Sequence, residues 1–304
     1  MPRISTYGSQ NSALMDLMRA QQGVFDAQQQ VTTGKKATDL KGIGHKAETL
    51  SASRASLARS EAYQEAATRT ASFLESQEIA LERINSSMTD LRVAVTEKQG
   101  DFVYGQVEDA FYQVVTALGA RHSGGYIFGG TRTDTNPLTI SSLDDLQALA
   151  TAGDAFQNSD RRPSVKLDET VTVETGMLAD EVGQEIFEIF KRIADYEAGP
   201  NGPFTNPLPG PQETFLINEM NNVVTAIDNL LAKTAQNGNA QANVDTIKQS
   251  HADRQIFLNI MIADLEDVDM AEAVTKFEQA QVALEVSART FSTLSQVTLL
   301  DYLR

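Results

Sequence analysis

The segment MAEAVTKFEQAQVALEVSARTFSTL, residues 270–294, places apolar residues at strict intervals of seven along two parallel columns. The columns are Met270, Phe277, Leu284 and Phe291, and Ala273, Ala280, Ser287 and Leu294. A strict seven-residue repeat favours a helix that supercoils against partner helices. Asp269 and Glu272 have the spacing of a capping box, which predicts that this helix begins at about residue 269.

Similar spacing recurs in the preceding parts of the chain. The apolar seam predicted for the first helix consists of Leu14, Leu17, Val24 and Val31, with Gln21 and Gln28 among them. Longer seams are predicted within residues 74–95, where Gln77 occupies one seam position, and within residues 244–265, where His251 does. The polar stretch QNGNAQAN around Gly238 indicates a weak point before the second of these seams.

Shorter amphipathic helices are predicted at about residues 101–120, 180–194 and 215–231. In the first of them we expect one core-facing side made of Phe102, Val107, Phe111, Val114 and Leu118.

The middle of the chain has a different composition. Seven of the eight prolines lie between Pro137 and Pro211. Residues 164–175 alternate apolar and polar side chains, which predicts strands, and residues 199–211 are predicted to form a loop. A small β-containing insert is therefore expected between two helical arms.

The fold class expected is mainly α with a small β-containing insert. The N- and C-terminal arms are expected to form a long antiparallel helical coiled coil or bundle. Three domains are predicted: residues 1–42 with 262–304, residues 43–130 with 212–261, and residues 131–211.

Charge and composition exclude several classes of function. The chain has 25 basic and 41 acidic residues and a net charge of -16, which argues against nucleic acid and anionic membranes as partners. It contains no Cys, and no run of about 18 apolar residues, so we expect neither a Cys-ligated zinc ion nor membrane insertion. Its three histidines form no metal-binding spacing. We expect no catalytic residue, no cofactor, no metal site and no cleaved signal peptide.

The terminal helices have narrow apolar seams surrounded by Gln, Ser and Thr. Such seams are typical of helices that need neighbours, so we expect the subunit interface to contain the arm residues Leu14, Leu17, Val24, Val31, Met270, Phe277, Leu284, Phe291 and Leu294. A helical bundle closed within one chain is the alternative.

Several motifs resemble the bacterial flagellin superfamily. They are R-I-S-T at residues 3–6, T-T-G-K-K at residues 32–36, and I-A-D-L-E-D-V-D-M-A-E-A at residues 262–273. Two further stretches are similar to the hook-associated members of that superfamily rather than to the flagellins. Their signature residues are Gly125, Tyr126, Phe128, Gly130, Thr131, Thr133, Pro137, Leu299, Leu300, Asp301, Tyr302 and Leu303. The turn after Gly34 departs from the superfamily, since it lacks the usual D-D-P.

The resemblance implies a structural subunit that joins the flagellar hook to the filament. It implies a helical homo-oligomer, with a neighbouring hook-associated junction protein, flagellin and a flagellar export chaperone as partners. It also implies export through the flagellar type III apparatus to the extracellular flagellum. A flagellin is the first alternative, a cytoplasmic signalling coiled coil the second, and an enzyme the last.

Overall fold

The computed structural model describes residues 3–97 and 100–302, without the side chains of residues 3–7, 97, 101 and 296–302. The chain divides into two compact units, a terminal unit of residues 1–59 with 254–304 and a central unit of residues 60–253. The described residues are mainly helical with two small antiparallel sheets, which confirms the predicted fold class. The predicted division into three domains stays a prediction.

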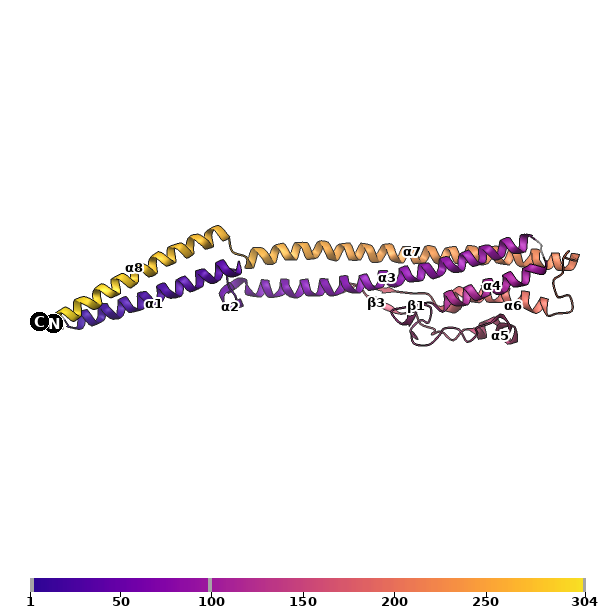
Figure 1. Ribbon diagram of the computed structural model, residues 1–304, viewed down its shortest axis with the longest axis horizontal. Helices are drawn as coiled ribbons and strands as arrows, with labels where there is room; N and C mark the ends of the chain where they lie inside the picture. Colours follow the sequence, from indigo (N-terminus) through magenta and orange to yellow (C-terminus); the bar gives the residue numbers. More distant parts are fainter. Residues whose placement is uncertain (1–2, 98–99, 303–304) are drawn as a thin grey trace. The chain divides into compact units, whose positions relative to one another are not determined.

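In the terminal unit, α1 (Arg3–Thr33) packs along α8 (Met270–Tyr302), and the start of α1 lies at the same end of the pair as the end of α8 (Figure 1). The two helices are antiparallel, because the end of α1 meets the start of α8 through the bond from the Val268 N–H to the Gly34 carbonyl, 2.9 Å. Asp269 accepts a hydrogen bond from the Ala271 N–H at 2.9 Å, which confirms the predicted start of the last helix.

Two longer helices pass from the terminal unit into the central unit, and short helical turns precede the first of them. These elements are α2 (Leu40–Ile43), the 3₁₀ turn η1 (Gly44–Lys46), α3 (Ala47–Glu97) and α7 (Gly210–Glu266). The weak point expected around Gly238 does not interrupt α7, which stays helical throughout.

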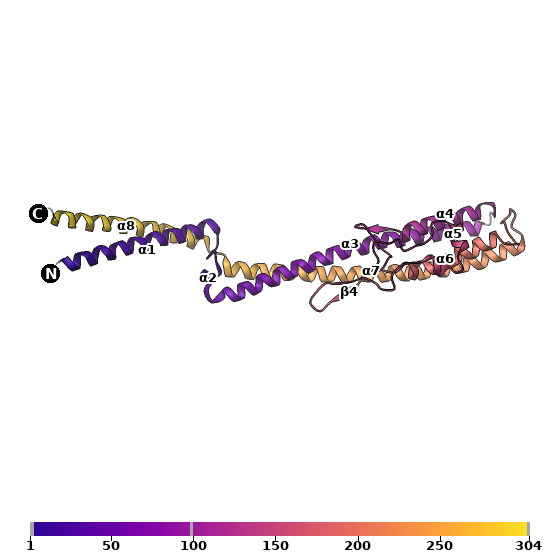
Figure 2. The same cartoon turned by 90° about the horizontal axis from the view of Figure 1, so that it is seen from below.

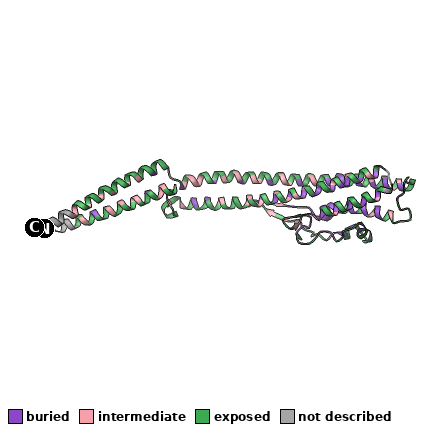
Figure 3. Cartoon of the chain, viewed as in Figure 1, coloured by how far each residue is buried: buried purple, intermediate pink, exposed green. Residues whose placement is uncertain are grey.

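In the central unit, α3 and α7 lie side by side in both views (Figures 1 and 2). Packed with them are α4 (Gly100–Leu118), α5 (Leu143–Ala148) and α6 (Ala179–Glu197), and a 3₁₀ turn, η2 (Ala152–Ala155), follows α5. Their aromatic core is built from Phe111, Phe156, Phe187 and Phe190, whose ring centroids lie 5.0–5.5 Å apart. Figure 3 shows most of the buried residues on these helices.

One residue of the predicted α4 face is placed wrongly. Val107, Phe111, Val114 and Leu118 are buried as expected, but Phe102 is 64% exposed and Val103 takes the core position instead. The period of 3.6 residues places position 103, not 102, one turn before Val107.

Both sheets are two-stranded hairpins in the central unit. β1 (Arg121–His122) pairs with β2 (Gly125–Tyr126), and β3 (Ser164–Lys166) pairs with β4 (Thr172–Glu174). The second hairpin contacts the helices through buried His251, whose Nε2 lies 2.8 Å from the Leu167 carbonyl oxygen and whose Nδ1 lies 3.3 Å from Ser60 Oγ. His251 is thus a packed residue that holds the hairpin against α3 and α7.

Candidate assembly site

The seam residues expected at the subunit interface lie along α1 and α8 and are only partly covered within one chain. Leu14 and Met270 are 40% and 46% exposed. Partial burial is shared by Leu17, Val24, Val31, Phe277, Leu284, Phe291 and Leu294. Of the second column, Ala273 is fully buried. The two helices therefore use their small residues for close contact and leave much of their larger apolar surface accessible.

Two further apolar rows lie outside the predicted seams. The α1 outer row consists of Met15, Met18 and Phe25, which are 52–61% exposed. The α8 outer row consists of Val274, Val282 and Val286, which are 41–61% exposed. Sequence analysis missed these rows because it followed only one face of each helix, although the spacings of 3, 7, 8 and 4 place each row on one helix face.

Charge is divided unequally between the two units. The terminal unit carries 12 basic and 12 acidic residues, whereas the central unit carries 13 basic and 29 acidic residues. The whole net charge of -16 therefore resides in the central unit. Because the terminal unit has no net charge, the exposed apolar rows of different copies can approach one another with little electrostatic repulsion.

The turn after α1 is fixed to the turn before α8 by a buried carboxylate. Glu266 is 4% exposed, accepts a hydrogen bond from Lys35 Nζ at 2.8 Å, and forms an ion pair with Arg54. The backbone contributes a bond from the Lys36 N–H to the Glu266 carbonyl at 2.7 Å. Gly34, with φ of 68°, makes the turn that brings Lys35 and Lys36 there. The T-G-K-K motif thus positions two cations at the base of the α1–α8 pair.

Burial by itself raises the pKa of the Glu266 carboxyl group. The hydrogen bond from Lys35 and the charges of Arg54 and Lys35 act in the opposite direction and outweigh it, so the pKa lies below its ordinary value. Glu266 is therefore ionised at neutral pH.

The signature segment from Gly125 to Pro137 forms the junction between α4 and the insert. Phe128 is fully buried and its carbonyl accepts from the Ala179 N–H at 3.0 Å, while the Tyr126 N–H donates to the Thr133 carbonyl at 2.8 Å. Pro137 is buried, and its carbonyl accepts from the Gln157 N–H at 2.8 Å. These bonds join the turn to the start of α6 and to the insert.

Gly130 has a steric role in this junction. Its φ is 67°, and a Cβ atom there would lie 2.7 Å from the Arg161 carbonyl oxygen and 2.8 Å from Leu178 Cδ2. Next to it, the Thr131 N–H donates to that same carbonyl at 3.1 Å, and Thr131 Oγ1 lies 2.6 Å from Ser159 Oγ. Backbone of the turn and of residues 159–161 therefore touch directly, and a side chain at position 130 would separate them.

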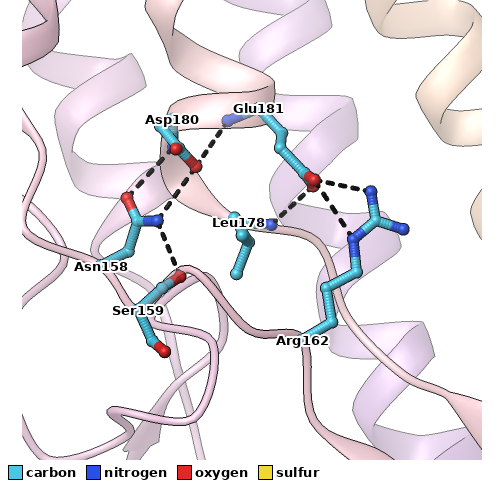
Figure 4. A network of polar contacts seen from close by, with 6 residues as sticks. All are labelled: Asn158, Ser159, Arg162, Leu178, Asp180 and Glu181. Atoms are coloured by element: carbon cyan, nitrogen blue, oxygen red, sulfur yellow. Dashed lines mark hydrogen bonds and ion pairs between the residues drawn. The ribbon is translucent and has the colours of Figure 1, made fainter.

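A polar network fixes the N-terminus of α6 beside this junction (Figure 4). Asn158 Nδ2 donates to Asp180 at 3.0 Å, and Arg162 donates to Glu181 at 2.7 Å. Burial by itself raises the pKa of the Glu181 carboxyl group. The hydrogen bonds from Arg162 and from the Leu178 N–H lower it by more, so the pKa lies below its ordinary value. Negative side chains are favourable at a helix N-terminus, so this network stabilises the fold around the signature turn.

The C-terminal signature is only partly within the described structure. Leu299, Leu300, Asp301 and Tyr302 belong to α8, but their side chains lie outside the described residues, and so does Leu303 entirely. Among the described residues there is no cluster of three or more potential metal ligands. No helix in the described ranges has both the length and the apolar character needed to cross a bilayer.

Comparisons with known proteins found similar folds and one matching family model. Two solved structures have a similar fold, each with a TM-score of 0.57. One is a protein of Vibrio parahaemolyticus assigned as a flagellar hook-associated protein, with 18% identity, and the match covers 73% of this chain and 97% of that one. The other is Bacillus cereus FlgL, with 16% identity and coverage of 70% and 99%. No curated protein sequence gives a significant match.

A family model for the bacterial flagellin C-terminal helical region matches residues 220–303. The match covers most of α7 and the whole of α8, which is one of the two helices of the candidate assembly site. Residues 220–303 are therefore similar to the C-terminal helical region of bacterial flagellins, and the fold resembles those of the two flagellar structures.

Proposed function

We propose that this protein is a structural subunit of the bacterial flagellum that joins the hook to the flagellin filament as a hook-associated junction protein, and that it has no enzymatic activity. The observation that carries the proposal is the α1–α8 pair, which exposes apolar rows on a unit without net charge and whose α8 lies in the segment similar to the flagellin C-terminal region. A subunit that acts by assembling with its neighbours needs exposed apolar surfaces of this kind, whereas an enzyme needs a cluster of catalytic side chains.

The mechanism is burial of the partly covered helices against neighbouring copies. Covering one large apolar side chain is worth about 1.5–3 kcal/mol. The α1 and α8 outer rows are different surfaces on different helices, so contact of one row with the other repeats from copy to copy. Such a heterologous contact produces a ring or a helical layer rather than a closed dimer.

The two ends of that layer would meet different partners. We infer that a neighbouring hook-associated junction protein covers one end and flagellin the other. The arm domain of residues 1–42 and 262–304 supplies these contacts, the rod domain of residues 43–130 and 212–261 supports it, and the insert of residues 131–211 lies outermost.

Export is part of the same proposal. The subunit leaves the cell through the flagellar type III apparatus, and a flagellar chaperone covers the apolar arms before export. A strain that lacks a functional export apparatus should then retain the protein in the cell, whereas export that continues in that strain would remove this part of the proposal.

A flagellin is the second candidate, because the matching family model is a flagellin region. The two candidates differ in how far the assembly grows. A junction protein stops after a short layer, and a flagellin continues to add subunits.

Electron microscopy of the purified protein separates these candidates. The protein is incubated alone, with filament seeds and with isolated hooks. Short caps on hook ends without further growth support a junction subunit, and long filaments support a flagellin. A rigid helical dimer that caps nothing would instead favour the cytoplasmic signalling coiled coil.

A further inference from the structure

A layer of buried polar side chains crosses the interface between α3 and α7 in the central unit. Gln77 on α3 is fully buried, and neither Oε1 nor Nε2 of its amide has a hydrogen-bond partner among the described residues. Asn237 on α7 is 2% exposed, and its Oδ1 likewise has none. Buried amides without partners are uncommon in folded proteins, so each one calls for an explanation.

The hydrogen bonds of α7 place these residues at one level. Asn237 Nδ2 donates to the Leu74 carbonyl at 2.9 Å, and Gln241 Nε2 donates to Glu78 Oε2 at 2.8 Å. Gln77 lies between Leu74 and Glu78 in sequence, and in a helix the carbonyl of Leu74 points toward the turn that contains Gln77. Gln77 is therefore at the same level of the helix pair as Asn237 and Gln241. Gln77, Asn237 and Gln241 are called the polar layer below.

Two apolar clusters lie on either side of the polar layer along α3 and α7, and partly buried Phe73 packs against both of them. On one side is the main core, which begins with Ala80 and Leu81 on α3 and ends with Leu230 on α7. On the other side is a small cluster of Ala67, Leu74, Leu167 and Val244, to which the β3–β4 hairpin contributes Leu167. From residue 232 to residue 243, α7 has no large apolar side chain. Apolar packing between α3 and α7 is therefore interrupted at the layer.

The helix itself is weakest at the same level. Gly238 follows Asn237 directly, is exposed, and has no atom within 4 Å of the position that a Cβ would take. Close packing therefore does not require a glycine there. Glycine inside a helix loses more conformational entropy on folding than alanine does, so Gly238 weakens α7 at a level where large apolar side chains are also absent.

We propose that the polar layer is a hinge, at which the α3–α7 pair bends or parts locally while the apolar clusters on both sides stay packed. Local opening occurs where few apolar contacts must be broken, and here the opening also gives the unpartnered amides access to water. The hinge gives the long α3–α7 helix pair a defined position at which it can bend. The proposal does not depend on the identity of the assembly that the subunit joins.

Hydrogen exchange of the intact full-length protein, read by mass spectrometry, tests the hinge. Backbone N–H groups of residues 72–79 and 235–242 should exchange faster than those of residues 81–88 and 244–251, by roughly tenfold. The reason is that a buried side-chain amide without a hydrogen-bond partner destabilises the packing around it, which makes local opening more frequent. Uniform protection along both helices would overturn the proposal.

Two variants and one control extend this test. The double variant Gln77→Leu/Asn237→Leu replaces the amides by apolar groups, and it should melt a few degrees higher and lose the fast exchange. Gly238→Ala should slow exchange at residues 235–242 without touching the core. The control Gln236→Leu, at an exposed position one residue away, should leave exchange unchanged.

The same variants can also contradict the hinge. The alternative role of the polar layer is to fix the register of α3 against α7, as buried Asn does in coiled coils. In that case the double variant melts lower or populates several species, and Gly238→Ala leaves the exchange at residues 235–242 as fast as before. Either result would overturn the proposal.

Discussion

Glu266 joins three segments of the terminal unit. It is nearly fully buried, whereas its partners Lys35 and Arg54 are half-exposed, and it ties the segment after α1 and the start of α3 to the end of α7. Its ionised form is stabilised by the fold, because its pKa is lowered when the chain is folded.

Replacing Glu266 by Gln should lower the free energy of unfolding of the terminal unit by about 1–2 kcal/mol, since two charge-assisted contacts are lost. Chemical denaturation followed by circular dichroism measures this. The control Glu285→Gln removes an exposed ion pair with Arg289 and should change stability by less than about 0.5 kcal/mol. Equal effects of both variants would contradict the assigned role of Glu266.

The same carboxylate predicts how stability changes with acid. Because the pKa of Glu266 is lower in the folded chain than in the unfolded chain, ionised Glu266 contributes fully to the free energy of unfolding above the ordinary carboxyl pKa. This contribution is lost as the pH falls through the pKa of the folded state. Wild type should therefore lose more stability than Glu266→Gln on acidification below about pH 4.5. Parallel acid curves for the two proteins would show that Glu266 is not responsible.

Gly130 and Gly238 form a natural pair for a steric test. Gly130→Ala should destabilise the central unit, by about 1–2 kcal/mol from its positive φ and by more from the contact with the Arg161 carbonyl. Gly238→Ala meets open space in a helix and should stabilise by up to about 1 kcal/mol. Urea denaturation of both variants checks the opposite signs, and destabilisation of similar size in both would refute the argument.

Among the elements, α8 was the one best predicted by the sequence. Its heptad spacing and its Asp269 cap are local features, so periodicity predicts the helix and the capping box predicts where it begins. The predicted strands and the short helix in residues 180–194 were found as β3, β4 and α6 for the same reason.

Other features depended on contacts that local patterns do not contain. The signature turn was recognised from Gly125 to Pro137, but its contact with Arg161 joins residues about thirty positions apart. The sequence does not predict the ion pairs of Glu266, because its partners Lys35 and Arg54 are more than two hundred residues away along the chain. The Phe102 error has a different cause, because the helical period itself places Val103, not Phe102, one turn before Val107.

The α1 outer row gives the most direct test of assembly at the level of one element. The double variant Met18→Ser/Phe25→Ser should keep the helix content of the monomer, because both side chains are exposed, and should reduce self-association at least tenfold. Analytical ultracentrifugation measures this. As control, Tyr112→Ser removes an exposed aromatic residue from the central unit and should leave association unchanged.

If Met18→Ser/Phe25→Ser associates as strongly as wild type, the row is not an interface. A loss of helix in this variant would mean that the row supports the fold of α1 instead. Both outcomes would require a different assembly surface.

For the molecule as a whole, the division of charge predicts how assembly responds to salt. Each central unit has a net charge of -16, so central units repel one another when the terminal units associate. Salt screens this repulsion. The screening length falls from about 10 Å at 0.1 M to about 3 Å at 1 M ionic strength. Light scattering should therefore show stronger self-association at high salt, whereas association that weakens with salt would mean that ion pairs drive the contact.

Labelling of intact flagella can show whether this chain is the proposed flagellar junction subunit. The sequence contains no cysteine, so Ala150→Cys, at an exposed position of the insert, provides a unique site for a gold or fluorescent label. The account predicts one labelled spot per flagellum, at the boundary between hook and filament. Label along the whole filament, or only inside the cell, would contradict it.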